Sequence, residues 1–223
     1  MVNFFWKFLG NMGTRIFFNR ETKISLYLFG AMHHTMIDTV AELSDGKYEQ
    51  AMDILIDLVK PLSEEMLSSI LFETSVLGIT FKNLISKFKD IKDFPYLLDL
   101  TLSSIWGKKW TKKIFNKTKF IPASRSDEKV DTYYMRLKSC PFCYPSPLPA
   151  EKLGRHRFGK FLTLTIETMT QIIQDFFGND LHVVAREIHC FHRGDLYGEI
   201  RVWLYPRKNL QLMDSNRYIQ EIK

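Results

Sequence analysis

Hydrophobic positions in the first half of the chain recur at helical spacing. The segment 21–43 places large apolar residues mostly three or four positions apart, which is typical of a helix with one buried face. A break at 44–46 is expected to start a second helix that Pro61 ends, and Ser63, followed by two acids, is a favourable cap for a third over 63–88. A shorter helix is predicted within 93–110.

The pattern changes to one typical of strands after this point. Segment 113–123 is rich in β-formers and 129–140 alternates, so both are predicted strands. Segment 140–154 holds four prolines and is expected to be irregular. An amphipathic helix follows over 157–178, and 180–206 predicts two further strands joined around a Gly-Asp turn.

This order of elements predicts the fold class α+β. We expect an antiparallel four-stranded sheet packed on one side by helices, with a helical N-terminal half. No internal repeat or clean linker is visible, which predicts one domain over 23–206. An aromatic-rich segment, 1–22, precedes it and a polar tail, 207–223, follows it.

Composition narrows the class of protein. Hydrophobic residues make up 45% and charged residues 25%, as in soluble globular proteins, and eighteen phenylalanines supply enough apolar surface for a pocket or a partner interface. No run approaches the ~20 apolar residues of a membrane span, and we expect no secretory signal in 1–22. Three cysteines make no disulfide framework, so we expect a reducing cytoplasm.

A lysine cluster accounts for much of the net charge of +6. Six lysines lie within 108–119, interleaved with aromatic residues: Lys108, Lys109, Lys112, Lys113, Lys117 and Lys119. Such a patch can bind anionic lipid headgroups and place the protein at a membrane surface. The alternative is a solvated helix end that runs into an exposed strand. A nucleic-acid partner is not expected.

The final hairpin carries a recognisable set of residues. The pattern runs from Val184 to Val202 and follows a helix with an early glycine, Gly159; its members are Glu187, Cys190, Gly194, Asp195, Tyr197 and Glu199. It resembles the C-terminal half of the four-vinyl-reductase domain. The superfamily of that domain also contains the transport-protein-particle (TRAPP) subunits of vesicle tethering and, more distantly, haem nitric-oxide-binding domains. The resemblance spans Tyr133 to Tyr205.

The resemblance implies a non-enzymatic ligand-binding or assembly domain. Its ligand would be a small hydrophobic molecule or acyl chain, held in a cavity between helices and sheet, and its partners a second copy or related subunits. The candidate lining residues are Phe29, His33, Tyr134, Phe158 and Phe161. Core packing is the alternative role for each of these side chains.

The resemblance also raises a zinc site. Zinc-binding relatives use cysteines and a glutamate, positions matched here by Glu187 and Cys190, although Gly198 stands where a second cysteine is usual. Cys140 and Cys143 have the C-x-x-C spacing of a zinc knuckle, and His156 is a further candidate ligand.

Two objections stand against this zinc site. Glu187 and Cys190 fall on opposite faces of a regular strand unless a bulge intervenes. Cys190 would otherwise be a small buried residue, and the C-x-x-C pair a reduced dithiol.

An enzyme is the alternative function. A zinc- or thiol-dependent reductase or hydrolase would draw its catalytic groups from the same cysteines and from His156 or His192, because a thiolate needs a nearby base. No phosphate loop, nucleophile elbow or H-E-x-x-H motif is present in the sequence.

Overall fold

The computed structural model describes residues 26–73, 75–76, 79–88, 90–140, 143 and 148–209. The predicted segment 1–22 and the tail beyond residue 209 lie outside these ranges. None of the described helices is long and apolar enough to cross a membrane.

The N-terminal half is helical, as predicted, but two of its predicted boundaries are wrong. Helix α2 spans Leu26–Leu43, and α3 runs without a break from Tyr48 to Phe72, through Pro61. A proline deprives the carbonyl four residues earlier of its helical partner. Pro61 and Asp57 are both exposed, so water can bind that carbonyl, and buried residues on either side of the proline hold the helix against the core.

The predicted helix over 63–88 ends at Phe72. A short antiparallel hairpin follows, formed by β1 (Ser75–Val76) and β2 (Ile79–Thr80), and then α4 (Phe81–Ile85). The β-branched residues of the hairpin favour extended backbone. Helix α5 (Phe94–Trp106) and helix α6 (Lys108–Ile114) are separated at Gly107, whose φ of 82° favours glycine.

The C-terminal half forms the predicted sheet. Strands β3 (Lys119–Ile121), β4 (Asp131–Leu137), β5 (Leu181–His189) and β6 (Gly198–Pro206) lie in the order β3-β4-β6-β5, and all neighbouring pairs are antiparallel. The amphipathic helix between β4 and β5 is α7 (Lys160–Phe176), and Gly178, with a φ of 70°, follows its end. The α+β class is therefore confirmed.

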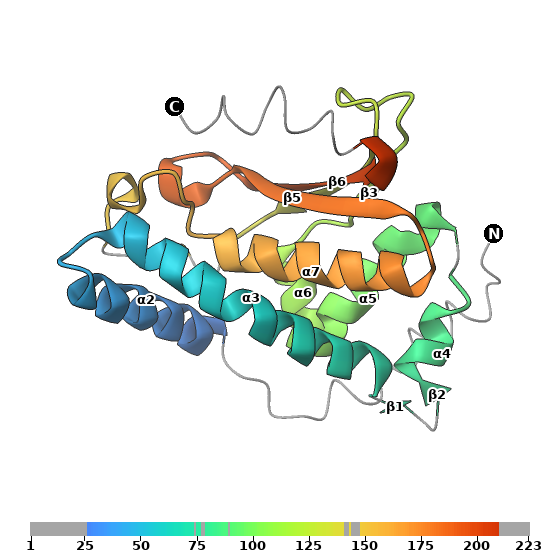
Figure 1. Cartoon of the computed structure of the whole chain (residues 1–223), viewed down its shortest axis with the longest axis horizontal. Coiled ribbons are helices and arrows are strands. Elements are labelled where there is room, and N and C mark those ends of the chain that lie inside the picture. Colours follow the sequence, from blue (N-terminus) through green and yellow to red (C-terminus); the bar gives the residue numbers. More distant parts are fainter. Residues whose placement is uncertain are drawn as a thin grey trace.

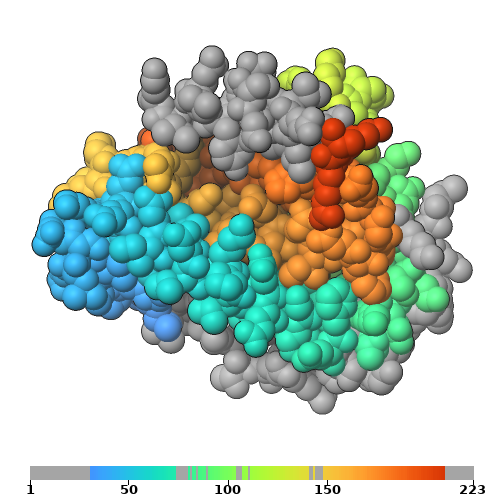
Figure 2. Space-filling model, in the orientation of Figure 1, coloured from blue at the N-terminus to red at the C-terminus, as the bar shows by residue number. Residues whose placement is uncertain are grey.

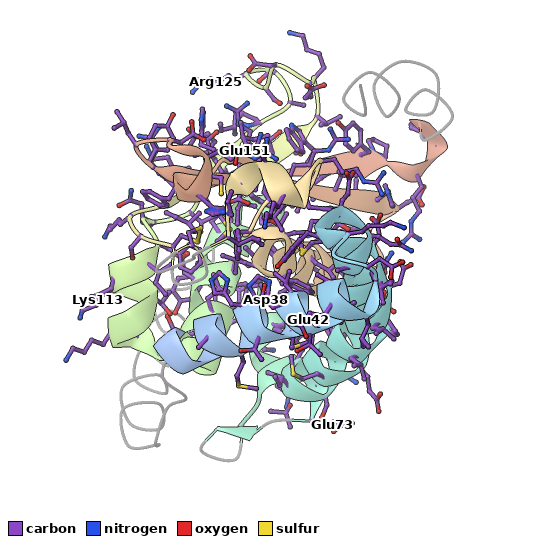
Figure 3. All side chains as sticks on the ribbon, turned by 90° about the vertical axis from the view of Figure 1, so that its left-hand side faces the viewer. Asp38, Glu42, Glu73, Lys113, Arg125 and Glu151 are labelled. Atoms are coloured by element: carbon purple, nitrogen blue, oxygen red, sulfur yellow. A yellow bond between two sulfur atoms is a disulfide. The ribbon has the colours of Figure 1, made fainter. Side chains whose placement is uncertain are left out.

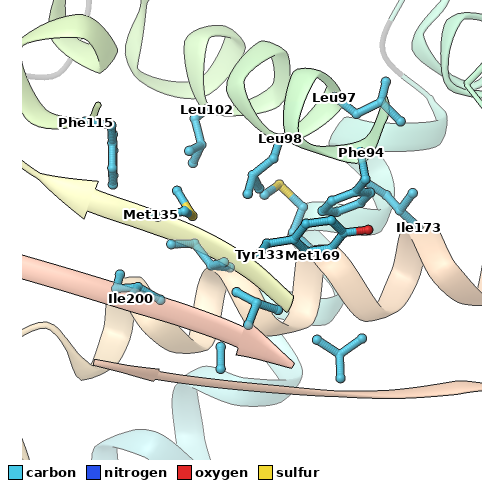
Figure 4. Close-up of a cluster of buried hydrophobic side chains, with 14 of the residues drawn as sticks. Phe94, Leu97, Leu98, Leu102, Phe115, Tyr133, Met135, Met169, Ile173 and Ile200 are labelled. Atoms are coloured by element: carbon cyan, nitrogen blue, oxygen red, sulfur yellow. The ribbon is translucent and has the colours of Figure 1, made fainter. Parts of the chain in front are cut away.

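Helices cover one face of the sheet (Figure 1). Helix α7 lies against the sheet, α3 packs against α7, and α2 packs against α3. Figure 4 shows the main core, in which side chains from α5 and α7 meet the inner face of β4 and β6. There Phe94 stacks on Tyr133 with ring centroids 4.6 Å apart, and the Tyr133 hydroxyl donates to the carbonyl of Ile91 at 3.1 Å.

A second, smaller core lies between α2, α3 and the first turn of α7. It comprises Ile37, Met52, Leu55, Leu148, Leu153, Phe158 and Phe161. The 3-10 turn Ala150–Leu153 brings Leu153 to the cluster. Most of the candidate site residues lie in or beside this second core.

Candidate functional site at the start of helix α7

A β-bulge in β5 brings Glu187 and Cys190 to the same face of the sheet. Glu187 pairs with Ile200 on the inner face, and the register shifts before His189, which pairs with Glu199 on the outer face. The extra residue reverses the alternation of side chains, so Cys190 returns to the inner face and is fully buried. The bulge removes the geometric objection that a regular strand raised.

The Glu187 carboxylate lies buried against the first turn of α7. The backbone N–H of Gly159 donates to its Oε2 at 3.1 Å, and the Cys190 thiol is a further hydrogen-bond partner. A Cβ added to Gly159 would lie 2.6 Å from both carboxylate oxygens, so glycine is what allows this close approach. Desolvation by burial raises the pKa of Glu187 from 4.5 to about 7, despite these hydrogen bonds and nearby arginines.

Cys190 is placed as a structural thiol. Burial, followed by the charge of Glu187, raises its pKa to about 11, whereas a nucleophilic cysteine needs a lowered pKa. The Cys190 backbone N–H donates to Asp195 Oδ2 at 2.7 Å, and Gly194 adopts a φ of 88° in the same turn. The Gly-Asp pair therefore closes the turn between β5 and β6.

We expect Glu187 to make stability fall as pH rises from about 4.5 to about 7. Because the pKa of Glu187 is raised in the folded state, the folded protein binds more protons than the unfolded chain between these two pH values. The contribution of Glu187 to the free energy of unfolding is therefore fully present below pH 4.5 and is lost as the pH rises through about 7. The loss is at most about 3 kcal/mol.

Denaturant melts across this pH range, for wild type and Glu187→Gln, measure the effect. The difference between the two proteins isolates Glu187, because His33, whose pKa burial lowers to about 3, contributes a slope of opposite sign. Two parallel stability curves would contradict a raised pKa at Glu187.

The other proposed zinc ligands have partners of their own in the structure. Cys140 and Cys143 form a disulfide, so as placed they are not the free thiols of a reduced dithiol. His156 Nε2 lies 2.9 Å from Asp53 Oδ1, and Arg155 also binds this carboxylate. In the described part of the chain, no group of three or more His, Cys, Asp or Glu residues is placed to hold a metal ion. The zinc site stays a prediction.

Three of the five predicted lining residues meet beside the second core. The His33 ring contacts Phe158 and Phe161 edge to face, with centroids 5.8 and 4.6 Å apart. All three side chains are buried, and burial keeps His33 neutral by lowering its pKa to about 3. His192, from the turn between β5 and β6, packs edge to face against Phe158 at 4.3 Å.

The other two predicted lining residues are not part of this cluster. Phe29 belongs to the first turns of α2, but its side chain lies outside the described part of the structure. Tyr134 lies on the outer face of the sheet, where its hydroxyl donates to the buried Glu199 carboxylate. Arg201 Nε also donates to Glu199, at 2.8 Å. Tyr134 therefore helps to bury an acid on the face opposite the core.

The sequence analysis missed an exposed apolar stripe on α3. It comprises Ile54, Leu58, Leu62 and Met66, which recur every four residues and are between 38% and 64% exposed. Helix α3 runs along the surface in Figure 2, and the adjacent helix α2 adds exposed Met32 and Met36. The four-residue spacing was present in the sequence, but the helix end predicted at Pro61 separated Ile54 and Leu58 from Leu62 and Met66.

Comparisons with known proteins found likeness in fold among solved structures. No family model matches the sequence, and no curated protein matches it. Among solved structures, the chain is similar to subunit 3 of a trafficking protein particle complex from Naegleria fowleri, covalently bound to palmitic acid. The identity is 14%, the match covers 80% of this chain and 94% of that chain, and the TM-score is 0.47. The function therefore has to be inferred from the residues of this chain.

Proposed function

We propose that this protein is a non-enzymatic assembly subunit that pairs with a second copy of itself through the α2–α3 surface. The observation that carries the proposal is the apolar stripe of α3, defined above. Single exposed apolar residues are common, but a contiguous apolar surface is typical of an interaction site. Four large side chains in line on one helix, beside two exposed methionines on its neighbour, meet that description.

The spacing of the stripe favours a second copy as the partner. Side chains four residues apart form a ridge on a helix, and such a ridge fits the matching groove of an identical helix, as in the commonest class of helix packing. A two-fold axis then places the same patch on both sides of the interface. Related subunits with a similar helix are the alternative partners.

Sedimentation velocity over about 1–100 μM protein tests this proposal. We expect a species of twice the 26.3 kDa chain mass to dominate at the upper end of the range. A chain that sediments as a monomer over the whole range would contradict self-assembly. A complex that forms only when a different subunit is added would assign the surface to that subunit.

We propose in addition that the assembly subunit holds a small hydrophobic molecule or acyl chain beside Phe158. The convergence of His33, Phe158 and Phe161 between α2 and α7 favours this place. A native mass per subunit above the denatured chain mass would report a guest that copurifies. Phe158→Trp is expected to remove the extra mass, since the larger side chain fills the site.

Phe176→Trp, at the other end of α7, is the matched control and is expected to keep the guest. Equal native and denatured masses for the wild type would contradict guest binding. A guest that remains on Phe158→Trp would contradict its location. The two outcomes are independent of the oligomeric state.

A further inference from the structure

A concave surface pocket lies between α5, α6, the segment leading into β3, and the residue that follows β4. Its volume is about 470 Å³, within the range of small-molecule sites. None of the described residues that line it belongs to α2, α3 or α7, so it is separate from both the apolar stripe and the Phe158 cluster. It is therefore a separate candidate binding site.

The polar lining of this pocket is strongly basic. Four lysines contribute to it: Lys108, Lys112, Lys117 and Lys138. Against them stands a single acid among the described lining residues, Asp99, which accepts a hydrogen bond from the Thr118 hydroxyl at 2.7 Å. Burial raises the pKa of Asp99 above its usual value. The pocket carries a surplus of positive charge.

One of the lysines is held in position by the backbone. Lys138 Nζ donates to the carbonyl of Lys112 at 3.0 Å, which fixes the ammonium group beside the last turn of α6. An ammonium group fixed in this way loses less conformational entropy when it binds an anion. It keeps two further N–H donors for that anion.

The rest of the described lining combines the polar residues Ser103, Thr111 and Asn116 with apolar walls. Tyr96, Leu100 and Phe115 supply these walls, and Tyr96 is held by stacking on Phe88 with ring centroids 5.2 Å apart. An inorganic anion gains no binding free energy from such walls. A ligand that also carries a ring or a short hydrocarbon chain can bury that apolar part against them. The lining thus combines a cationic rim with a hydrophobic wall.

We propose that this pocket binds a phosphate-bearing molecule, with the phosphate between Lys112, Lys117 and Lys138 and an apolar part against Tyr96 and Phe115. Lysines bind phosphate as point charges from several directions, which suits a rim with four of them. The same chemistry occurs in a soluble phosphate ester and in a lipid headgroup. The proposal does not depend on self-assembly.

Isothermal titration with phenyl phosphate and with inorganic phosphate is the direct test. We expect phenyl phosphate to bind at least about tenfold more tightly, because only it can use the apolar wall. The double substitution Lys117→Gln/Lys138→Gln is expected to weaken phenyl phosphate binding by at least about tenfold. Both lysines lie at the surface, and an unchanged melting temperature confirms that the variant is folded.

Lys109→Gln/Lys113→Gln, which removes two charges at exposed positions outside the described lining, is the matched control. Lys113 belongs to the same helix, α6, but does not line the pocket and points away from the body of the molecule (Figure 3). We expect this variant to bind phenyl phosphate as the wild type does. An equal loss of binding in both variants would mean that the effect comes from general surface charge, and this would overturn the proposal. Absence of phenyl phosphate binding by the wild type would also overturn it.

Flotation with vesicles distinguishes the two sources of phosphate. Phosphatidylcholine vesicles with phosphatidylinositol 4-phosphate are compared with phosphatidylcholine vesicles with phosphatidylserine at equal surface charge. Flotation that favours the phosphoinositide and is lost in the pocket variant identifies a lipid headgroup. Phenyl phosphate binding without flotation identifies a soluble ligand. Equal flotation with both kinds of vesicle, and for the wild type and the pocket variant alike, would contradict a phosphate-specific pocket.

Discussion

The double substitution Leu58→Glu/Leu62→Glu is expected to leave the protein monomeric at concentrations where the wild type is a dimer. Both leucines lie at the centre of the exposed stripe and are more than half exposed, so the folded monomer tolerates the carboxylates. In the dimer the four added charges would be buried without partners, which costs several kcal/mol. We expect the dimer dissociation constant to rise at least about 100-fold, measured by sedimentation equilibrium.

A charge-matched variant separates the interface from general repulsion. Asn83→Glu/Ser124→Glu adds the same charge at two exposed positions outside the stripe, and we expect it to dimerise as the wild type does. Its melting temperature and that of the stripe variant should match that of the wild type. If the stripe variant remains dimeric, or if both variants become monomeric, the α3 stripe is not the contact surface.

The substitution Gly159→Ala is expected to cost about 3 kcal/mol of folding free energy, because it overpacks a buried site. The backbone at Gly159 has a φ of −75° and tolerates alanine, so the cost arises from contact alone. The added Cβ would lie 2.6 Å from the carboxylate oxygens of Glu187. Glu187 is buried under the first turn of α7 and has little room to move away. Denaturant unfolding measures the loss.

A double-mutant cycle with Glu187→Ala shows whether the loss of stability in Gly159→Ala is caused by the contact with Glu187. With the carboxylate removed, Gly159→Ala should be nearly neutral, which gives a coupling of at least about 1.5 kcal/mol. Additive losses would mean that the glycine is needed for another reason. The cycle tests the placement of Glu187 without reference to any ligand.

Periodicity predicted the elements whose two faces differ clearly. Alternation located β4, β5 and β6, and helical spacing located α7, because in each case one face lies on the core and the other does not. The inner face of β6 is formed by Ile200, Val202 and Leu204, as its alternation indicates. These elements suffice for the α+β class and for an antiparallel four-stranded sheet, but the strand order β3-β4-β6-β5 was not predicted.

Features that depend on tertiary contacts were not predictable from the same pattern. Pro61 is a local signal for a helix end, but packing on both sides of it maintains α3. The bulge before His189 has no signature in the residues that form it, yet it alone brings Glu187 and Cys190 together. Asp53, which binds Arg155 and His156 from more than a hundred residues away, could not be paired with them from spacing.

The candidate site was predictable only in part for the same reason. The side chains of three candidates meet because α2 and the start of α7 lie near each other: His33, Phe158 and Phe161. The sequence indicated these residues but could not show that they are in contact. Tyr134 was a candidate because it is an aromatic residue within the resemblance, but the register of β4 turns it to the opposite face. The basic pocket needed Lys138, which lies outside the lysine cluster in sequence.

Hydrogen–deuterium exchange of the wild-type protein at low and high concentration tests self-assembly through α3 most directly. We predict that peptides covering the stripe from Ile54 to Met66 become protected as the dimer forms, while peptides from the outer face of the sheet, including Tyr134, exchange at an unchanged rate. Dimerisation with unchanged exchange along α3, or with protection confined to the sheet, would contradict the account.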